Sequence, residues 1–256
     1  MLKKRLIGVI TVLDNWAVQS KGYKDYLPLG KPSVLAKNLD NWGADEIFIQ
    51  IIDRTKNNLG PDFNLIKSLA ELSLSTPLTY AGGISSINDA INVIKNGCER
   101  ISIDSLIHND PSEVEKIASI LGSQALIASI PVSINQNNIF WYDYKKNLYK
   151  ERFEELEKIT SQKLVSEILL IDKDREGFRN SFQEEIINLF PIKDFPLIIF
   201  GGITEREQIK NFFNYEFINS VAIGNSLNYK EHMIQNHKKA LNNEKTRTAF
   251  YKNDIF

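Results

Sequence analysis

Two stretches of the sequence, residues 48–84 and 167–203, repeat one pattern at a fixed distance. Asp53 and Asp172 are separated by 119 positions, and so are Gly82 and Gly201. In each stretch the aspartate follows an apolar run, and a Gly-Gly pair follows the next such run. A constant shift close to half of the 256 residues indicates an internal repeat. The chain is therefore expected to consist of two similar halves.

Eight short apolar runs alternate with amphipathic segments along the chain. Most of the runs are continuous in Ile, Val and Leu, which is typical of strands buried on both faces of a parallel sheet. They cover residues 6–12, 46–52, 78–80, 100–103, 125–130, 167–171, 197–200 and 221–223. Eight strand–helix units with a two-fold repeat predict an α/β fold, a single (β/α)8 TIM barrel made of two duplicated half-barrels over residues 1–256.

Long segments follow several of the expected strands at their C-terminal ends, where barrels of this kind build their sites. Residues 13–31 are expected to form a loop after the first strand. Residues 132–151 are expected to form a long loop or a β-hairpin after the fifth. The second segment contains the aromatic run 140–144. Because loops of more than ~12 residues are usually functional or disordered, this run either covers the barrel mouth or packs on itself.

Charge and composition exclude several classes of protein. The 31 basic and 32 acidic residues leave a formal net charge of −1, which gives no field to attract nucleic acid or an anionic membrane. No apolar run approaches the ~20 residues of a membrane span, and the apolar run at 6–12 is too short for a signal peptide. The lone Cys98 has no partners at metal-ligand spacing. We expect a cytoplasmic protein without metal or cofactor.

Glycine-rich turns at the expected strand ends predict two phosphate-binding cups. Glycine lets backbone amides approach a ligand, and a helix N-terminus that follows favours an anion. The first cup would comprise Gly82, Gly83 and Ser105, and the second Gly177, Gly201, Gly202, Gly224 and Asn225. Asp104 would oppose a phosphate in the first cup because like charges repel. The first cup is therefore the weaker prediction.

Segments from nearly the whole chain resemble the HisF family, the cyclase subunit of imidazole glycerol phosphate synthase. The matching segments, in order, are residues 1–7, 30–32, 43–47, 81–84, 122–125, 167–170 and 174–177. The resemblance implies that a HisH glutaminase docks beneath the barrel and that ammonia is conducted through it. At the top, ammonia would cyclise and cleave a ribonucleotide that carries two phosphates.

The sequence departs from that family at the positions of its two catalytic aspartates. Thr11 and Pro131 stand there. A positioned acid or base contributes roughly 10²- to 10⁴-fold to a rate, so the cyclase activity implied by the family is doubtful. Asp14 and Asp172 are the candidate substitutes. Asp104 also replaces an asparagine of the family's phosphate cup.

Four charged residues match the gate through which the family admits ammonia. They are Arg5, Glu46, Arg100 and Glu167, each at the start of an expected strand. Four buried charges are expensive unless they pair with one another. The alternative is that they form ion pairs with a structural role only, since barrel bottoms usually serve stability.

A retained gate without the cyclase acids resembles a HisF-like branch associated with glycosyl amidation, the WbuZ type. This resemblance implies delivery of ammonia from a HisH-like glutaminase for amidination of a surface-polysaccharide sugar, with a separate ATP-dependent sugar amidotransferase as a further partner. One alternative is an authentic cyclase subunit of histidine biosynthesis. The other is a non-catalytic activator of a glutaminase.

Overall fold

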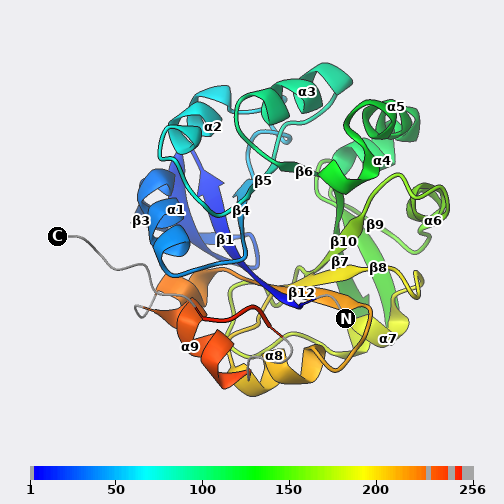
Figure 1. The fold of residues 1–256 in the computed structure, drawn as a ribbon. Coiled ribbons are helices and arrows are strands. Elements are labelled where there is room, and N and C mark those ends of the chain that lie inside the picture. The colour runs from blue at the N-terminus through cyan, green and yellow to red at the C-terminus, as the bar shows by residue number, and fades with distance from the viewer. Residues whose placement is uncertain (1–2, 229–231, 242–245, 250–256) are drawn as a thin grey trace.

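The protein folds into a closed barrel of parallel strands with helices around it (Figure 1). The computed structural model describes residues 3–228, 232–241 and 246–249. The barrel strands pair in the order β10, β11, β12, β1, β4, β5, β6 and β7, and β7 pairs with β10 to close the ring. Their bounds are β1 (Arg5–Leu13), β4 (Glu46–Ile51), β5 (Leu78–Ala81), β6 (Arg100–Ile103), β7 (Leu126–Asn135), β10 (Glu167–Asp172), β11 (Leu197–Phe200) and β12 (Ile218–Ile223). The predicted (β/α)8 TIM barrel is confirmed.

Helices follow the strands and cover the outside of the barrel (Figure 1). Their bounds are α1 (Pro32–Asn41), α2 (Phe63–Ala70), α3 (Ile87–Lys95), α4 (Ser105–Asn109), α5 (Pro111–Leu121), α6 (Glu154–Ser161), α7 (Glu185–Leu189), α8 (Arg206–Phe212) and α9 (Met233–Ala240), with 3-10 turns η1 (Ser123–Ala125) and η2 (Asn225–Asn228). Local chemistry fixes their starts: the Asp110 carboxylate accepts a hydrogen bond from the Glu113 amide, with Pro111 in the first turn of α5. No helix in the described part of the chain is long and apolar enough to cross a bilayer.

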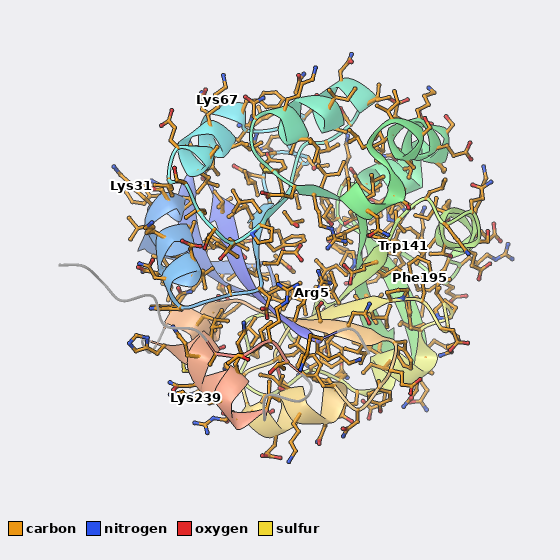
Figure 2. The ribbon with its side chains drawn as sticks, in the orientation of Figure 1. Arg5, Lys31, Lys67, Trp141, Phe195 and Lys239 are labelled. Atoms are coloured by element: carbon orange, nitrogen blue, oxygen red, sulfur yellow. The ribbon has the colours of Figure 1, made fainter. Side chains whose placement is uncertain are left out.

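Two separate apolar clusters result from the continuous apolar strands. The larger one lies between the strands and the helices. The smaller one fills the inside of the barrel, and its members are Ile7, Val9, Phe48, Ile127, Leu169, Ile171, Ile198, Phe200 and Ala222. Figure 2 shows Arg5 near the centre of the ring, whereas Lys31, Lys67 and Lys239 project outward. The barrel interior is therefore an apolar space that ends in charged side chains.

Two β-hairpins extend strands beyond the barrel. The expectation of a loop at residues 13–31 is wrong for most of that segment, because β2 (Trp16–Lys21) pairs with β1 and with β3 (Asp25–Gly30). Asp14 and Asn15 turn the chain with φ of 48° and 66°, and Asp and Asn tolerate this left-handed backbone in two-residue hairpin turns. For residues 132–151 the structure shows the predicted β-hairpin rather than a long loop. Strand β7 pairs with β8 (Asn138–Asp143), and β8 pairs with β9 (Leu148–Lys150).

The repeated Gly-Gly pairs occupy equivalent places in the two halves. Gly82 follows β5 with φ of +133°, and Gly201 follows β11 with φ of +110°. A Cβ added to Gly82 would lie 2.5 Å from the carbonyl oxygen of Ile51, at the end of β4. A Cβ added to Gly201 would lie 2.5 Å from the carbonyl oxygen of Asp172, at the end of β10. Both glycines therefore allow a close approach to the neighbouring strand.

Candidate functional site

Four charged side chains converge where β1, β4, β6 and β10 begin, and we call them the floor ring. Arg5 Nη1 lies 2.8 Å from Glu46 Oε2, and Arg5 Nη2 donates a hydrogen bond to Glu167 Oε1. Arg100 Nη1 lies 2.8 Å from Glu167 Oε2 and 3.4 Å from Glu46 Oε2. Each arginine contacts both glutamates, so the structure brings all four predicted gate residues together.

The floor ring is largely withdrawn from solvent. The side chains of Glu46, Glu167, Arg100 and Arg5 are 2%, 9%, 15% and 18% exposed. The Thr79 hydroxyl donates to Glu46, and Arg100 Nη2 donates to the Ser166 hydroxyl at 2.8 Å. Because desolvation costs several kcal/mol per buried ion, these charges are tolerated only in their mutual pairing. Any opening of the floor must separate ion pairs.

Hydroxyl groups line one side of the barrel interior above the floor ring, and we call Thr79, Ser102 and Ser129 the hydroxyl line. They lie on the adjacent strands β5, β6 and β7. Thr79 contacts the floor ring through Glu46, and the Ser102 and Ser129 hydroxyls lie 2.6 Å apart. Side chains alternate along a strand, so Ser102 faces the same side of β6 as Arg100, one step nearer the mouth.

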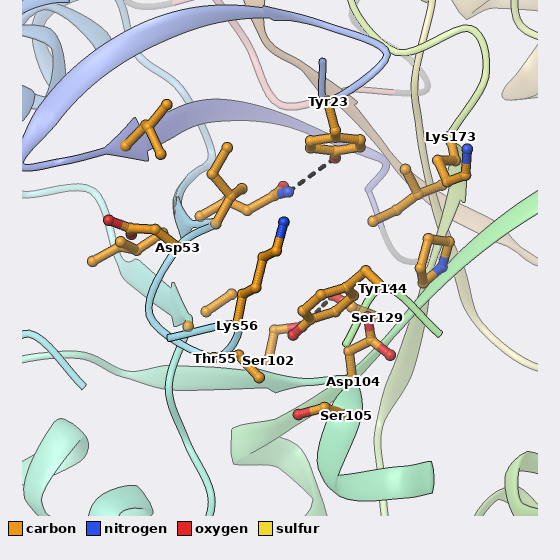
Figure 3. A pocket seen from close by; sticks show the side chains of 18 of the residues that line it. Tyr23, Asp53, Thr55, Lys56, Ser102, Asp104, Ser105, Ser129, Tyr144 and Lys173 are labelled. Atoms are coloured by element: carbon orange, nitrogen blue, oxygen red, sulfur yellow. Dashed lines mark hydrogen bonds between the residues drawn. The ribbon is translucent and has the colours of Figure 1, made fainter. Parts of the chain in front are cut away.

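A cavity of about 500 Å³ opens above the hydroxyl line at the C-terminal ends of the strands, and we call it the mouth cavity (Figure 3). Ser102 and Ser129 line its base. Both hairpins contribute tyrosines to its wall: Tyr23 and Tyr26 from the first, Tyr142 and Tyr144 from the second. Gln50 Nε2 donates to the Tyr23 hydroxyl at 2.9 Å (Figure 3). The aromatic run at residues 140–144 thus reaches the mouth.

The residues of the first predicted cup lie near one another, but the Gly83 amide is used within the protein. The Gly83 amide donates to the Thr55 hydroxyl at 2.8 Å. The side chains of Thr55 and Ser105 both interact with the Tyr144 hydroxyl, and burial raises the pKa of this tyrosine. Gly82 and Ser105 line the mouth cavity beside the carboxyl group of Asp104. These contacts leave little for a phosphate to bind.

The residues of the second predicted cup also converge, around a space of about 20 Å³ lined by Gly177, Gly201, Gly202, Gly224 and Asn225 among others. A volume of this size holds about one water molecule. Asn225 Nδ2 donates to the Ser20 carbonyl at 2.6 Å, and Asn225 Oδ1 accepts from the Ser20 amide at 3.3 Å. The side chain of Asn225 therefore holds β2 of the first hairpin.

Glu176 fixes the same hairpin. Its Oε2 accepts from the Ser20 hydroxyl at 2.7 Å and from the Tyr23 amide at 3.3 Å. Burial raises the pKa of this carboxyl group to about 7, although these hydrogen bonds oppose the rise. The loop after β10 and the first hairpin are thus joined across the mouth.

The candidate catalytic positions lie in different surroundings. Thr11 is buried and pairs with Val18 of β2, whereas Pro131 lines the mouth cavity. Asp14 is exposed in the hairpin turn and also lines the cavity. Asp172 is fully buried, and its carboxylate accepts from the amides of Arg175 at 3.2 Å and Gln183 at 2.9 Å. Burial raises the pKa of Asp172 to about 6, while these bonds hold the loop after β10.

Comparison with known proteins decides the family. The sequence profile described as "Histidine biosynthesis protein" matches residues 5–233. The chain belongs to this family.

The curated relatives include one from Vibrio vulnificus strain YJ016, named putative imidazole glycerol phosphate synthase subunit hisF2. It is 30% identical over 249 residues, which cover 96% of this chain and 90% of the relative. A Campylobacter jejuni protein with the same description is 31% identical over 80% of this chain and 82% of its own. The imidazole glycerol phosphate synthase subunit HisF of Campylobacter concisus is 29% identical over 82% of this chain and 84% of its own length. The protein is therefore a HisF-like barrel subunit of the histidine biosynthesis protein family.

Sequence reasoning missed a polar cluster beside the mouth cavity of this family member. Asp104 Oδ1 is buried with no hydrogen-bond partner in the described part of the chain, and it lies 3.7 Å from His108 Nε2. Burial raises the pKa of Asp104 well above its ordinary value, and the charge of Asp143 adds to the rise. The spacing of Asp104 and His108 at i and i+4 was the available signal, since such residues share one face of a helix.

Proposed function

We propose that this chain is the ammonia-conducting barrel subunit of a glutamine-dependent amidotransferase, with a HisH-like glutaminase docked beneath the floor ring. The floor ring carries the proposal, because four buried charges meet at the bottom of a barrel whose hydroxyl line leads to the mouth cavity. In this account ammonia enters through the floor ring and leaves into the mouth cavity.

The barrel interior suits ammonia in its neutral form. The nine apolar side chains inside the barrel disfavour ammonium, because an unpaired charge is costly in apolar surroundings. Neutral ammonia can exchange hydrogen bonds with the hydroxyl line as it moves. The charges of the floor ring would therefore control entry, and the apolar wall would select the uncharged species.

We further propose that the nitrogen is delivered for amidination of a surface-polysaccharide sugar, together with a separate ATP-dependent sugar amidotransferase. Thr11 and Pro131 supply no carboxylate at the positions where the cyclases of the family have their acids. Asp172, one of two candidate substitutes, is engaged by backbone amides. A barrel that keeps the floor ring without these acids fits a conduit better than a cyclase.

Coupling between glutamine hydrolysis and nitrogen transfer tests the conduit. With a HisH-like glutaminase and the amidotransferase present, we expect Arg5→Ala and Glu167→Ala to lower transfer of glutamine nitrogen while hydrolysis continues. Arg152→Ala is the matched control, because Arg152 forms a surface pair and its side chain is 83% exposed. Unchanged coupling in both floor variants would remove the proposal. A glutaminase that is stimulated without any transfer would instead favour a non-catalytic activator.

The second candidate is a cyclase subunit of histidine biosynthesis, which the names of the family and of the Campylobacter concisus relative favour. In that case Asp14 and Asp172 would have to act as acid and base. Turnover of the family's two-phosphate ribonucleotide with an ammonium salt would establish the cyclase and displace the sugar proposal. Inactivity, with the matched HisF of Campylobacter concisus active in parallel, would remove the cyclase.

A further inference from the structure

Two carboxyl groups that line the mouth cavity each have an oxygen with no hydrogen-bond partner among the described residues. These oxygens are Asp104 Oδ1 and Asp53 Oδ1, and both are buried. One polar atom of the Gln50 amide is also unpaired, whichever way the amide is turned, because only the other one bonds Tyr23. Buried polar groups in proteins normally have partners, so these carboxyl groups would suit a ligand that donates hydrogen bonds.

His108, which faces Asp104, has a defined tautomer. His108 Nδ1 lies 2.9 Å from the ammonium group of Lys150, which can only donate, so Nδ1 accepts and the proton is on Nε2. This Nε2–H faces Asp104 at 3.7 Å. The imidazole ring packs on Trp141 with ring centroids 3.8 Å apart.

Aromatic rings form the walls beside these acceptors. The Tyr23 hydroxyl accepts a hydrogen bond from Gln50 (Figure 3), and Tyr144 interacts with Thr55 and Ser105. The two rings come from different hairpins and both line the cavity. A site with apolar aromatic faces and a few oriented polar groups suits a ring-shaped ligand with a polar edge.

The charges around the cavity do not select an anion. Its lining contains three lysines and three aspartates: Lys24, Lys56, Lys173, Asp14, Asp53 and Asp104. Lys173 is already paired with Asp174 at 2.8 Å and lies over the ring of Tyr142 at 4.6 Å. The amide of Gly83, which a phosphate would need, is bonded to Thr55. The formal charges of these six residues cancel, so the lining carries no excess of positive charge for an anion.

We propose that the mouth cavity binds an uncharged, polyhydroxylated ring of the pyranose type, which donates hydrogen bonds to Asp104 and Asp53 and packs between the tyrosines. Asp104 is a binding residue, and His108 is a positioning residue that acts through Asp104. The inference deepens the proposed function, on which it rests for the arrival of ammonia in the same cavity, by placing the sugar acceptor there.

Sugar binding is measured on the purified chain without a glutaminase. A negative result would therefore count against the sugar site and not against the proposed ammonia path. The probes are N-acetylglucosamine, N-acetylgalactosamine and ribose 5-phosphate. Binding is detected by changes in the NMR chemical shifts of the Ser105 and Tyr144 amides. We expect one of the two amino sugars to shift these signals at lower concentration than ribose 5-phosphate. Preference for the phosphate, or no shift with either amino sugar, would overturn the proposal.

Asp104→Asn tests the role of the Asp104 carboxyl group in binding while keeping the size and shape of the side chain. Asparagine keeps one acceptor oxygen and replaces the other with an NH2 donor, so we expect sugar binding to weaken about tenfold, as for loss of one hydrogen bond. Binding of ribose 5-phosphate should not weaken, because the carboxyl group offers a phosphate no favourable charge. Asp110→Asn is the matched control, because Asp110 caps α5 away from the cavity and asparagine caps equally well. Equal sugar affinity in Asp104→Asn and wild type would contradict the assignment.

Two variants of His108 test its positioning role. His108→Gln keeps an N–H donor for Asp104, and we expect it to retain most of the sugar affinity. His108→Phe keeps an aromatic ring to pack on Trp141 but has no donor, and we expect several-fold weaker binding. Equal binding by both variants would show that only the packing of residue 108 matters and would remove the positioning role.

Discussion

The floor and the mouth of this barrel use their predicted residues in opposite ways. At the floor, Arg5 and Arg100 each contact Glu46 and Glu167, and the four side chains form one closed ring. At the mouth, two residues of the predicted cups are engaged by the chain itself. The Gly83 amide donates to Thr55, and the Asn225 side chain holds Ser20 of the first hairpin. Buried charges of opposite sign need partners, so their contacts with one another can be predicted from the sequence, whereas a glycine can serve many structural purposes.

The largest expected effect is at the floor ring. Glu46→Ala leaves two largely buried arginines with one carboxylate, and breaking a buried pair in this way costs about 3 to 5 kcal/mol. We expect the free energy of unfolding in urea to fall by that amount. Glu154→Ala, which removes the partner of Arg152 in an exposed pair, is the control and should change little. A loss below about 1 kcal/mol for Glu46→Ala would mean that the ring is not a buried network.

The next effect concerns the attachment of the first hairpin at the mouth. The pKa of Glu176 rises from 4.5 to about 7 in the folded protein, so between these values the folded state binds more protons than the unfolded state. The stabilisation that protonated Glu176 contributes to the folded state is therefore complete below about pH 4.5 and is lost as the pH rises through 7.

Glu176→Gln keeps an oxygen for Ser20 and Tyr23 but does not titrate. The free energy of unfolding of the wild-type protein should fall between acidic and mildly alkaline pH. In Glu176→Gln we expect this fall to be smaller by about 2 to 3 kcal/mol. Urea unfolding of both proteins across that range provides the measurement. Parallel pH profiles for wild type and variant would contradict the burial of an ionisable group at this contact.

Substitution of alanine for Gly82 and Gly201 allows the stability of the two halves of the mouth to be compared. Gly82→Ala and Gly201→Ala combine a strained φ with a Cβ 2.5 Å from a carbonyl oxygen, and we expect each to lose about 2 kcal/mol of stability. Gly30→Ala is the control for φ alone, because Gly30 has φ of +135° and open space at the Cβ position, and it should lose about 1 kcal/mol. Equal losses at all three sites would mean that the strand contact carries no cost.

The sequence predicted the barrel because continuous apolar runs and the 119-residue repeat are both visible without tertiary contacts. It did not predict the first hairpin, although Asp14 and Asn15 were a usable turn signal. The cluster around Asp104 was hidden for another reason. His108, Lys150 and Trp141 come from α4 and the second hairpin, and only the closed barrel brings them beside the cavity.

The proposed ammonia path can be tested most directly by blocking it midway. Ser129→Leu places a larger apolar side chain on the hydroxyl line, above the floor ring and away from the proposed glutaminase contact. Transfer to the acceptor is measured in the reconstituted system with glutamine and, separately, with an ammonium salt that enters from the mouth. We expect the variant to lose most glutamine-driven transfer and to keep ammonium-driven transfer. Equal retention with both nitrogen sources would contradict passage of ammonia through the barrel.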